Sequence, residues 1–433
     1  MPGTAVIGLQ WGDEAKGKIV DVLTSRNDIV VRYQGGANAG HTIVVGDEKY
    51  KLSLIPSGIF RPQVQCVIAG GVVIDPAALL NEMDTLTTRG IAIGKNLMIS
   101  DRAHVIFPWH RLEDALFDQV GSDEPLGTTK RGIGPCYRDK VGRVLAVRLG
   151  DFYHPHCKEH IKDVVEAKNR ILGGWIKDKS PGTLELDSEF NADRIYDEYA
   201  GYAERLRPFV ADTTDFLLDA VDADKRILFE GAQGSLLDVD HGTFPYVTSS
   251  NSSGVGISSG SGVPSRFISK MVGVLKAYTT RVGGGPFPTE QDNDIGTKIR
   301  SRGNEYGTVT KRPRRCGWFD TVAARYTARL AGVNVLSLML LDVLSTFDTI
   351  QVCTAYNLDN QRIRFFPASS EDLRLVSPIY EALPGWSEDI TGVRKFEDLP
   401  FNAQRYVKRI GELVGKPVEM ISVGPDREQI IVV

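Results

Sequence analysis

The chain has 433 residues, of which 42% are hydrophobic and 24% are charged, as in an ordinary folded globular protein. Its 51 basic and 55 acidic residues give a formal charge of −4, which excludes a strong positive field that would attract nucleic acid. Five scattered cysteines without a C-x-x-C pair argue against a disulfide framework. Because no secretory pattern and no long apolar span is present, we expect a cytoplasmic protein without a membrane partner.

The most informative stretch is Gln-Trp-Gly-Asp-Glu-Ala-Lys-Gly-Lys, residues 10–18, between an apolar run and an amphipathic run. The order of strand, glycine-containing turn and helix predicts backbone N–H groups and a positive helix end that can bind phosphate. The spacing from Gly12 to Lys18 satisfies G-x-x-x-x-G-K, but Ile19 stands where a Ser or Thr normally holds Mg²⁺. We therefore expect another magnesium ligand, and Asp13 is the nearest carboxylate.

Strand and helix patterns alternate along the rest of the chain. We predict strands over residues 28–33, 65–69, 96–100, 226–230, 271–282, 335–342, 349–356 and 418–423, and helices over residues 76–89, 103–120 and 318–330. This alternation predicts an α/β fold, a single large domain over residues 1–433 with a mostly parallel central sheet. Residues 152–225 are predicted to be a helical insertion, and the Ser/Gly run 249–262 a surface loop near the site.

Polar glycine-rich turns follow several of these strands, where open α/β sheets place their binding sites. Asp13 and His41 come after two strands that we expect to be neighbours, so they could face one cleft. A positioned carboxylate can accept a proton, and an imidazole can donate to an oxygen on which charge develops. A lone Asp or His is more often structural, but both of these residues lie in motif-like loops.

The stretch over residues 10–18 resembles the nucleotide loop of the adenylosuccinate synthetase family, which joins aspartate to IMP using GTP. The family has Gly where this chain has Ala15. Residues 132–143 match the family's second signature at every fixed position. Segments 229–234, 245–250 and 286–290 extend the resemblance to nearly the whole chain, from residue 4 to about residue 428.

The resemblance implies a reaction through a 6-phosphoryl-IMP intermediate. Asp13 would take the N1 proton of IMP so that O6 attacks the γ-phosphate of GTP, and His41 would steady the phosphoryl group, with Gln233 as a third catalytic residue. Asp13 and the backbone carbonyl of Gly40 would hold Mg²⁺. Arg143 would reach the IMP phosphate of the partner subunit, which implies a homodimer.

Further binding residues follow from the same resemblance, position by position. The GTP contacts fall on Gly12, Asp13, Glu14, Ala15, Lys16, Gly17, Lys18, Gly40, His41, Thr42, Asp342, Ser422, Gly424 and Pro425. The IMP contacts fall on Asp13, Asn38, Thr129, Arg143, Gln233, Thr248, Val282 and Arg312. The aspartate contacts fall on Thr308, Val309, Thr310, Arg312 and Arg314.

The chain departs from the family at Ala15, Lys130, Val309, Lys311, Pro313 and Leu340. These departures leave open a paralogous ligase that takes another amine, purine nucleotide or phosphate donor such as ATP. A non-catalytic nucleotide-binding protein is a second alternative, but the presence of Asp13 and His41 argues against it. The segment His154-Pro-His-Cys-Lys-Glu-His160 offers zinc ligands, although its close spacing disfavours tetrahedral closure.

Overall fold

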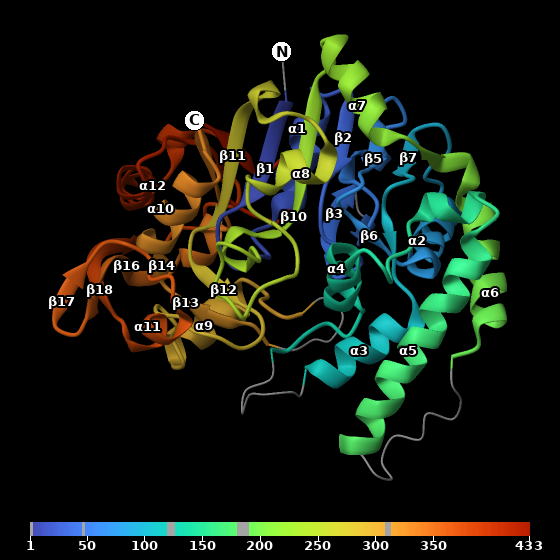
Figure 1. Cartoon of the computed structure of the whole chain (residues 1–433). Coiled ribbons are helices and arrows are strands. Elements are labelled where there is room, and N and C mark those ends of the chain that lie inside the picture. Colours follow the sequence, from blue (N-terminus) through green and yellow to red (C-terminus); the bar gives the residue numbers. More distant parts are fainter. Residues whose placement is uncertain (1–2, 46–47, 119–125, 180–189, 308–312) are drawn as a thin grey trace.

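The structure is a computed structural model that describes residues 3–45, 48–118, 126–179, 190–307 and 313–433 (Figure 1). Its centre is a ten-stranded sheet. In spatial order the strands are β20 (Ile430–Val432), β19 (Val418–Ser422), β15 (Val335–Met339), β11 (Ile268–Lys276), β1 (Gly3–Gly8), β10 (Ile227–Gly234), β2 (Ile29–Arg32), β5 (Gln65–Ile68), β7 (Leu97–Ser100) and β9 (Val210–Ala211). Neighbouring strands are parallel, except that β19 and β20 are antiparallel. The predicted α/β fold around a mostly parallel sheet is confirmed.

Helices cover both faces of this sheet. Successive side chains of a strand point to opposite faces, and the apolar side chains of β1 pack on both. On one face, Val6 of β1 packs with Ile19 of α1 (Lys16–Thr24). On the other face, Ala5 and Ile7 of β1 belong to the largest core cluster. The helices in that cluster are α7 (Thr213–Asp222), α8 (Gly256–Ser261), α9 (Asp294–Arg302), α10 (Thr321–Leu330) and α12 (Phe401–Val414).

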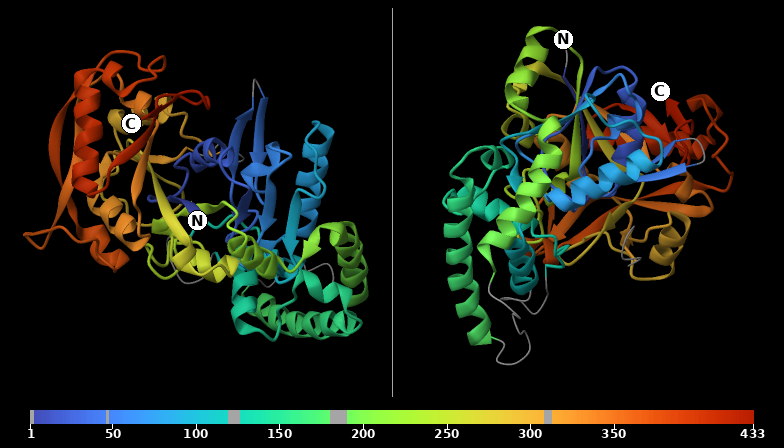
Figure 2. Two further views of the ribbon diagram at one scale, coloured as in Figure 1. Left: turned by 90° about the horizontal axis from the view of Figure 1, so that it is seen from above. Right: turned by 90° about the vertical axis from the view of Figure 1, so that its right-hand side faces the viewer.

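Two additional layers lie at opposite ends of the central sheet (Figure 2). At one end, α5 (Cys157–Lys179) and α6 (Ala192–Leu206) share a core with α2 (Pro76–Thr88). At the other end is a four-stranded sheet, which contains β14 (Phe319–Asp320), β16 (Phe347–Leu358), β17 (Gln361–Ile363) and β18 (Ser377–Trp386), with α11 (Ser370–Leu375) beside it. The predicted helical insertion over residues 152–225 therefore contains α5, α6 and α7, and it also supplies β9 to the edge of the central sheet.

Short ribbons and helices surround the carboxyl ends of the central strands. They are β3 (His41–Val45) with β4 (Glu48–Leu52), β6 (Val73–Ile74) with β8 (His104–Val105), β12 (Thr279–Arg281) with β13 (Arg315–Gly317), α3 (Pro108–Phe117) and α4 (Ile133–Gly142).

Proline decides the start of two predicted helices. Asp75 caps α2 by accepting the N–H of Ala78 at 3.1 Å, and Pro76 occupies the first helical position, as predicted. The helix predicted over residues 103–120 starts too early, because residues 104–105 form β8 and α3 begins only at Pro108. A proline ring fits the first helical turn, where its missing N–H needs no partner.

The strand predicted over residues 271–282 is interrupted. The side chain of Gln10 accepts the N–H of Lys276 at 3.0 Å and donates to the carbonyl of Tyr278 at 2.8 Å. These bonds replace sheet partners at the break, so β11 ends at Lys276 and β12 pairs with β13 instead. The sheet therefore opens where the nucleotide loop begins.

The Ser/Gly run over residues 249–262 is not the surface loop that we predicted. Ser252 and Ser253 are fully buried, and residues 256–261 form α8. Ser253 donates its N–H and its hydroxyl to the carboxylate of Asp238, both at 2.9 Å. The hydroxyls satisfy backbone and carboxylate groups inside the protein, which makes a polar run compatible with burial.

Candidate active site

A cavity of about 760 Å³ opens at the carboxyl ends of β1, β10 and β2, where parallel sheets place ligands. Most of the predicted site residues line it. These are Gly12, Asp13, Glu14, Ala15, Lys16, Gly17, Asn38, Gly40, His41, Thr129, Gln233, Thr248, Val282 and Arg314. The cavity also has apolar walls from Trp11, Phe244 and Tyr246, which suits a flat heteroaromatic ligand.

The nucleotide loop is held by an internal carboxylate. Glu14 is fully buried and accepts the N–H groups of Gln10 at 3.0 Å and Gly12 at 2.9 Å, and its second oxygen pairs with Lys16 at 2.7 Å. Burial disfavours its charge, but attraction to Lys16 and the N–H bonds hold the pKa of the Glu14 carboxyl below its usual range. A Cβ on Gly8 would lie 2.4 Å from this carboxylate, so only glycine fits there.

Asp13 and His41 face the same cavity, but the reason predicted for their proximity is wrong. The strands that precede them, β1 and β2, are not neighbours, because β10 lies between them. In register, Glu230 of β10 lies between Val6 of β1 and Arg32 of β2. The intervening strand therefore brings its own polar residues, Glu230 and Gln233, to the site.

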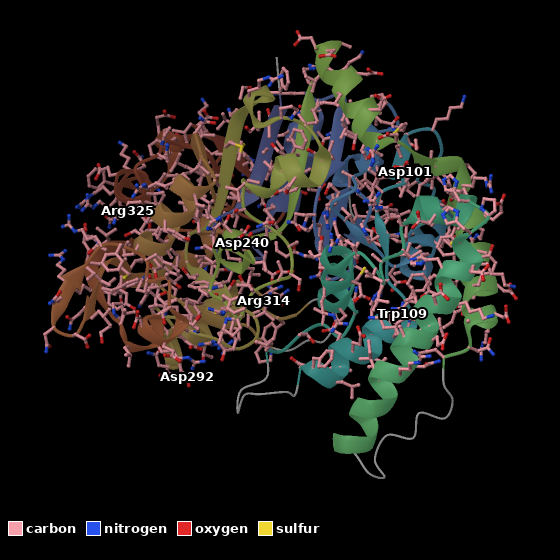
Figure 3. The ribbon with its side chains drawn as sticks, in the orientation of Figure 1. Asp101, Trp109, Asp240, Asp292, Arg314 and Arg325 are labelled. Carbon is pink, nitrogen blue, oxygen red and sulfur yellow. The ribbon has the colours of Figure 1, made fainter. Side chains whose placement is uncertain are left out.

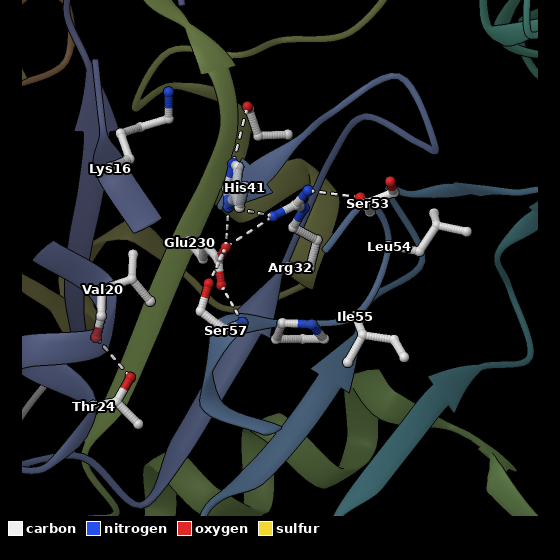
Figure 4. A network of polar contacts seen from close by, with 12 residues as sticks. Lys16, Val20, Thr24, Arg32, His41, Ser53, Leu54, Ile55, Ser57 and Glu230 are labelled. Carbon is white, nitrogen blue, oxygen red and sulfur yellow. Dashed lines mark hydrogen bonds and ion pairs between the residues drawn. The ribbon is translucent and has the colours of Figure 1, made fainter. Parts of the chain in front are cut away.

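His41 is bound to a buried carboxylate behind the cavity wall (Figure 4). Its Nδ1 lies 2.5 Å from the Oε1 of Glu230, and its Nε2 lies 3.4 Å from the carbonyl of Ala232. Burial lowers the pKa of His41, and the neighbouring Arg32 lowers it further, against the opposite effect of Glu230. Burial also opposes charge on Glu230, but its bonds with His41 and Arg32 lower its pKa to about 2.

Asp13 is paired with an arginine that was predicted to bind aspartate. Its side chain is 35% exposed, and its Oδ2 lies 2.8 Å from the Nε of Arg314, which Figure 3 labels. Arg314 also donates to Glu305 at 2.6 Å, and Glu305 accepts from Lys276 and Tyr278, each at 2.5 Å. Burial lowers the pKa of Arg314, but Asp13 and Glu305 outweigh it and raise that pKa. Asp13, the predicted base, and Arg314, a predicted aspartate-binding residue, are therefore in direct contact.

Two buried polar atoms in the cavity wall offer free hydrogen-bonding capacity. Gln233 donates its Nε2 to Asn38 at 3.1 Å, but its Oε1 is buried and has no partner in the described part of the chain. The same holds for the Oγ1 of Thr248. Because a buried polar atom without a partner costs free energy, these atoms indicate where a polar ligand binds.

A second group of predicted residues lies away from this cavity. Lys18 donates to the hydroxyl of Ser422 at 2.8 Å and to the carbonyl of Gly424 at 2.7 Å. Burial lowers the pKa of Lys18 to about 8, although Asp342 raises it. The Oδ1 of Asp342 is buried without a partner among the described residues. Lys18 therefore ties α1 to the carboxyl-terminal segment that contains Ser422, Gly424 and the exposed Pro425.

Two further predicted residues of the described chain, Arg143 and Thr42, do not line the cavity. Arg143 follows α4 as an exposed residue with φ of 69°, and Thr42 belongs to β3. The predicted aspartate contacts Thr308, Val309, Thr310 and Arg312, together with the departure Lys311, lie outside the described residues. Of the family departures, Leu340 has φ of 58° and packs against two core clusters.

Comparison with known proteins identifies the family of this chain. The sequence matches the adenylosuccinate synthetase family over residues 5–431. The chain belongs to the adenylosuccinate synthetase family. Adenylosuccinate synthetases of Caldanaerobacter subterraneus subsp. tengcongensis and Clostridioides difficile are 51% and 50% identical to it, over 100% of this chain and 99% of each relative. Membership makes the chain a C–N bond-forming ligase, and its reaction is the GTP-dependent joining of L-aspartate to IMP in purine nucleotide synthesis.

Solved structures extend the likeness to three dimensions. The fully ligated adenylosuccinate synthetase of Plasmodium falciparum superimposes with a TM-score of 0.89 at 36% identity, and 99% of both chains is covered. The succinoaminodeoxyadenylate synthetase of cyanophage S-2L, solved with dGMP and with dATP as energy donor, shares the fold at a TM-score of 0.59 and 20% identity. That comparison covers 100% of this chain and 95% of the phage enzyme.

Sequence reasoning missed the residues behind the cavity wall of this synthetase. Glu230 lies in the segment Phe-Glu-Gly-Ala-Gln-Gly that carried part of the resemblance, but it was given no role. A carboxylate that directly follows the apolar run Ile-Leu-Phe is a signal for a buried and paired charge. Its partners Arg32 and Ser57 are distant in sequence and could not be identified without the fold.

Two absences concern the described part of the chain. No group of three or more His, Cys, Asp or Glu side chains is placed to hold a metal ion there, and the His154–His160 segment forms no such group. The Nε2 of His160 instead lies 3.1 Å from the carbonyl of Ala146. None of the described helices is both long and apolar enough to span a membrane.

Proposed function

We propose that Asp13, His41 and Gln233 carry out the chemistry of this ligase in two steps. In the first, the Asp13 carboxylate takes the N1 proton of IMP, O6 attacks the γ-phosphorus of GTP, and GDP leaves. In the second, the amine of aspartate attacks C6, the phosphate leaves with the O6 oxygen, and this phosphate takes up the proton that the amine loses. The observation that supports this assignment is that Asp13 after β1, His41 after β2 and Gln233 near the end of β10 line one cavity.

The nucleotide phosphates are proposed to bind at the turn before α1. Lys16 and the backbone N–H groups at the start of α1 lie at the cavity, and the helix end favours negative charge. The side chain of Glu14 keeps Lys16 in place from inside the loop. The Nε2 of His41, which also lines the cavity, is the ring nitrogen left for a phosphoryl oxygen, because its Nδ1 is engaged by Glu230.

The residues present fit a magnesium ion. Asp13 offers a partly exposed carboxylate, and a Cβ on Gly40 would meet no described atom within 4 Å, so the backbone there borders open space. Mg²⁺ is usually held by one or two carboxylates together with phosphate oxygens and water. We propose that Asp13 and the Gly40 carbonyl hold it, where it would neutralise charge on the transferred phosphoryl group.

The polar wall formed by Asn38, Thr129, Gln233, Thr248 and Val282 is proposed to bind IMP. The unpartnered oxygens of Gln233 and Thr248 support this assignment, since IMP offers ribose hydroxyls as donors and a phosphate that accepts from a hydroxyl. Arg314 is proposed to bind a carboxylate of aspartate, exchanging Asp13 for the substrate. That exchange would free the Asp13 carboxylate for the N1 proton and for magnesium.

We further propose a homodimer in which Arg143 contacts the IMP phosphate of the partner subunit. Arg143 is exposed, and the apolar Val141 and Val144 beside it are 77% and 74% exposed. Such residues are typical of a surface that a partner covers. Mixing Asp13→Ala and Arg143→Leu proteins should restore activity in hybrid dimers. Demonstrated subunit exchange without any recovery would rule out action in trans.

Cytoplasmic location is also proposed, and the five buried free cysteines support it, since all five are thiols in the structure. The direct test of the function is an assay of purified protein with IMP, aspartate and either GTP or ATP, following adenylosuccinate and phosphate together. Asp13→Asn should lower kcat by about 10²–10⁴. Turnover of Asp13→Asn within a few-fold of wild type, or equal kcat/KM with ATP, would contradict the proposal.

A further inference from the structure

A buried carboxylate next to the cavity has all of its neighbours inside the protein. Glu230 is fully buried and does not line the cavity. Its Oε1 accepts from the Nη1 of Arg32 at 2.9 Å and from the hydroxyl of Ser57 at 2.8 Å, and it lies 2.5 Å from the Nδ1 of His41. Its Oε2 accepts the N–H of Ser57 at 2.8 Å. Figure 4 shows these four groups converging on the carboxylate.

This carboxylate is held in place without the help of His41. The guanidinium of Arg32 balances its charge, and the second nitrogen of that guanidinium donates to the carbonyl of Ser53 at 2.8 Å. The chain from Ser53 to Ser57 is itself held by Glu82, which accepts the N–H groups of Ser53, Leu54 and Ile55 at 2.9–3.2 Å. Arg32, Ser57 and Glu82 therefore form a rigid frame around Glu230.

The frame decides what the ring of His41 can do. An ionised carboxylate only accepts hydrogen bonds, so the Nδ1 of His41 must carry the hydrogen that Glu230 accepts. With this nitrogen occupied, the ring is left with Nε2 directed toward the carbonyl of Ala232 and the cavity that His41 lines. Arg32 cannot accept the hydrogen of Nδ1, because a guanidinium only donates. Its Nη1 donates to Glu230 and lies 3.1 Å from the Nδ1 of His41.

We propose that Glu230 is a positioning residue for phosphoryl transfer, which fixes the orientation and tautomer of the His41 ring so that Nε2 is presented to the phosphate groups in the cavity. The inference rests on the proposed role of His41. A neutral ring with hydrogen on Nδ1 has only an acceptor at Nε2, so Nε2 donates to a phosphoryl oxygen once it has also taken up a proton. The Glu230 carboxylate on Nδ1 stabilises the imidazolium that this forms. Lys16, the other charged group near the ring, is already paired with Glu14.

The first measurement is spectroscopic. In protein labelled with ¹⁵N-histidine, His41 should show the Nδ1–H pattern, and the signal should be assigned with His41→Asn. In Glu230→Gln the amide can supply an NH₂ donor toward Nδ1, so the ring should change tautomer or populate both forms. The control is Asp139→Asn, which makes the same change at the second buried histidine pair and should leave the His41 signal unchanged. An unchanged His41 pattern in Glu230→Gln would overturn the proposal.

The second measurement is kinetic. Glu230→Gln should lower kcat about 10- to 100-fold, as the loss of a group that orients a functional histidine typically does. The dissociation constants of IMP and GTP should change by less than about threefold, because Glu230 does not line the cavity. A loss confined to ligand affinity would contradict the proposal.

Folding is controlled with a second variant, because Glu230→Gln leaves Arg32 unpaired. Glu230→Asp keeps the negative charge for Arg32 but withdraws the carboxylate from His41 by one methylene. Its kcat should still fall at least about tenfold while its thermal unfolding stays close to wild type. Wild-type turnover in a folded Glu230→Asp protein that has lost the His41 Nδ1–H pattern would overturn the proposal.

A double-variant cycle separates this inference from the proposed role of His41. If Glu230 acts through His41, the variant with both His41→Asn and Glu230→Gln should be no slower than His41→Asn alone. Additive losses would show that Glu230 acts by another route. If His41→Asn itself keeps wild-type kcat, the role of His41 fails, whereas the spectroscopic test still decides whether Glu230 sets its tautomer.

Discussion

Two buried histidines of this protein are each bound to a carboxylate, but only one of them faces the cavity. His41 lies 2.5 Å from Glu230, and the Nε2 of His110 lies 2.9 Å from Asp139. Both imidazoles are at least 93% buried, since their exposed fractions are 7% and 2%. Burial lowers the pKa of both histidines, and the nearby carboxylate opposes this in both. By composition and burial the two pairs are equivalent.

The difference lies in the second ring nitrogen. In His110, Nδ1 accepts the N–H of Phe107 at 3.0 Å, so both nitrogens are used inside the core. Asp139 also binds Lys168 at 2.6 Å, and Lys168 binds Glu113 at 2.8 Å, which ties α3, α4 and α5 together. In His41 the second nitrogen has only a long contact of 3.4 Å with the carbonyl of Ala232, and the ring lines the cavity. A buried histidine–carboxylate pair is thus available for chemistry when its second ring nitrogen is not held by a strong bond inside the protein. We call His41 with Glu230 the open pair and His110 with Asp139 the closed pair.

The strongest test of this comparison replaces each histidine by asparagine. His41→Asn should lower kcat by about 10²–10⁴, because it removes the donor presented to the phosphoryl group, with little change in thermal unfolding. His110→Asn should instead destabilise the fold and leave kcat within about threefold. Steady-state kinetics and urea unfolding of both variants give the answer. If His110→Asn is the slower enzyme, the distinction between open and closed pairs is wrong.

Removing the Lys168 ammonium that binds Asp139 of the closed pair should lower the free energy of unfolding and leave kcat unchanged. Lys168→Met leaves Asp139 and Glu113 without their shared buried cation, although exposed Arg138 still pairs with Glu113. Loss of one partner of a buried ion pair typically costs about 3–5 kcal/mol of unfolding free energy. Adding Asp139→Asn to Lys168→Met should recover part of this loss. A variant as stable as wild type would show that the cluster does not hold these helices together.

The stabilising contribution of Glu230 in the open pair should depend on pH. The pKa of Glu230 is about 2 in the folded chain and 4.5 when unperturbed, so its stabilisation is complete above pH 4.5 and is lost as pH falls toward 2. Wild type should therefore lose about 2 kcal/mol more than Glu230→Gln between pH 6 and pH 3. Urea titrations of both proteins at these two pH values measure the difference. Equal losses would mean that Glu230 is not ionised by its frame.

The smallest effect concerns Ala15 in the nucleotide loop, which lines the same cavity as His41. Ala15 has φ of 61° and ψ of 32°, a left-handed conformation that costs a residue with Cβ about 1–2 kcal/mol. Ala15→Gly should raise the free energy of unfolding by about 0.5–1 kcal/mol, after allowance for the greater freedom of glycine in the unfolded chain. Thermal unfolding is the readout, and Gly90→Ala, at φ of 81°, is a control that should destabilise. A lower melting temperature for Ala15→Gly would contradict the strain argument.

Local patterns allowed several parts of the fold and site to be predicted. The turn before α1, the Asp75 and Pro76 start of α2 and the parallel sheet follow from residue types a few positions apart. Fourteen predicted site residues line the cavity because they belong to contiguous loops at strand ends. Their motifs also carried the family resemblance, which family comparison confirms.

Other features depend on contacts between residues that are far apart in sequence. The sequence predicted that β1 and β2 are neighbours, yet strand order depends on which surfaces pack best in the whole sheet, and β10 separates them. Gln10 ends β11 through residues 266 and 268 positions away, and Asp238 makes a serine run part of the interior. No periodicity in one segment can report such partners.

The amino-acid sequence alone determined which loops carry the chemistry of this synthetase, because glycine turns, phosphate-binding helix starts and acid–base side chains are encoded in short segments. Only the tertiary structure decided that His41 is the open pair and His110 the closed one. The residues next to each histidine in the sequence do not show what its ring nitrogens bind. Groups on other elements decide whether the second ring nitrogen is bound inside the protein or faces the cavity. Glu230 and Arg32 supply those groups for His41, whereas Phe107 and Asp139 use both nitrogens of His110.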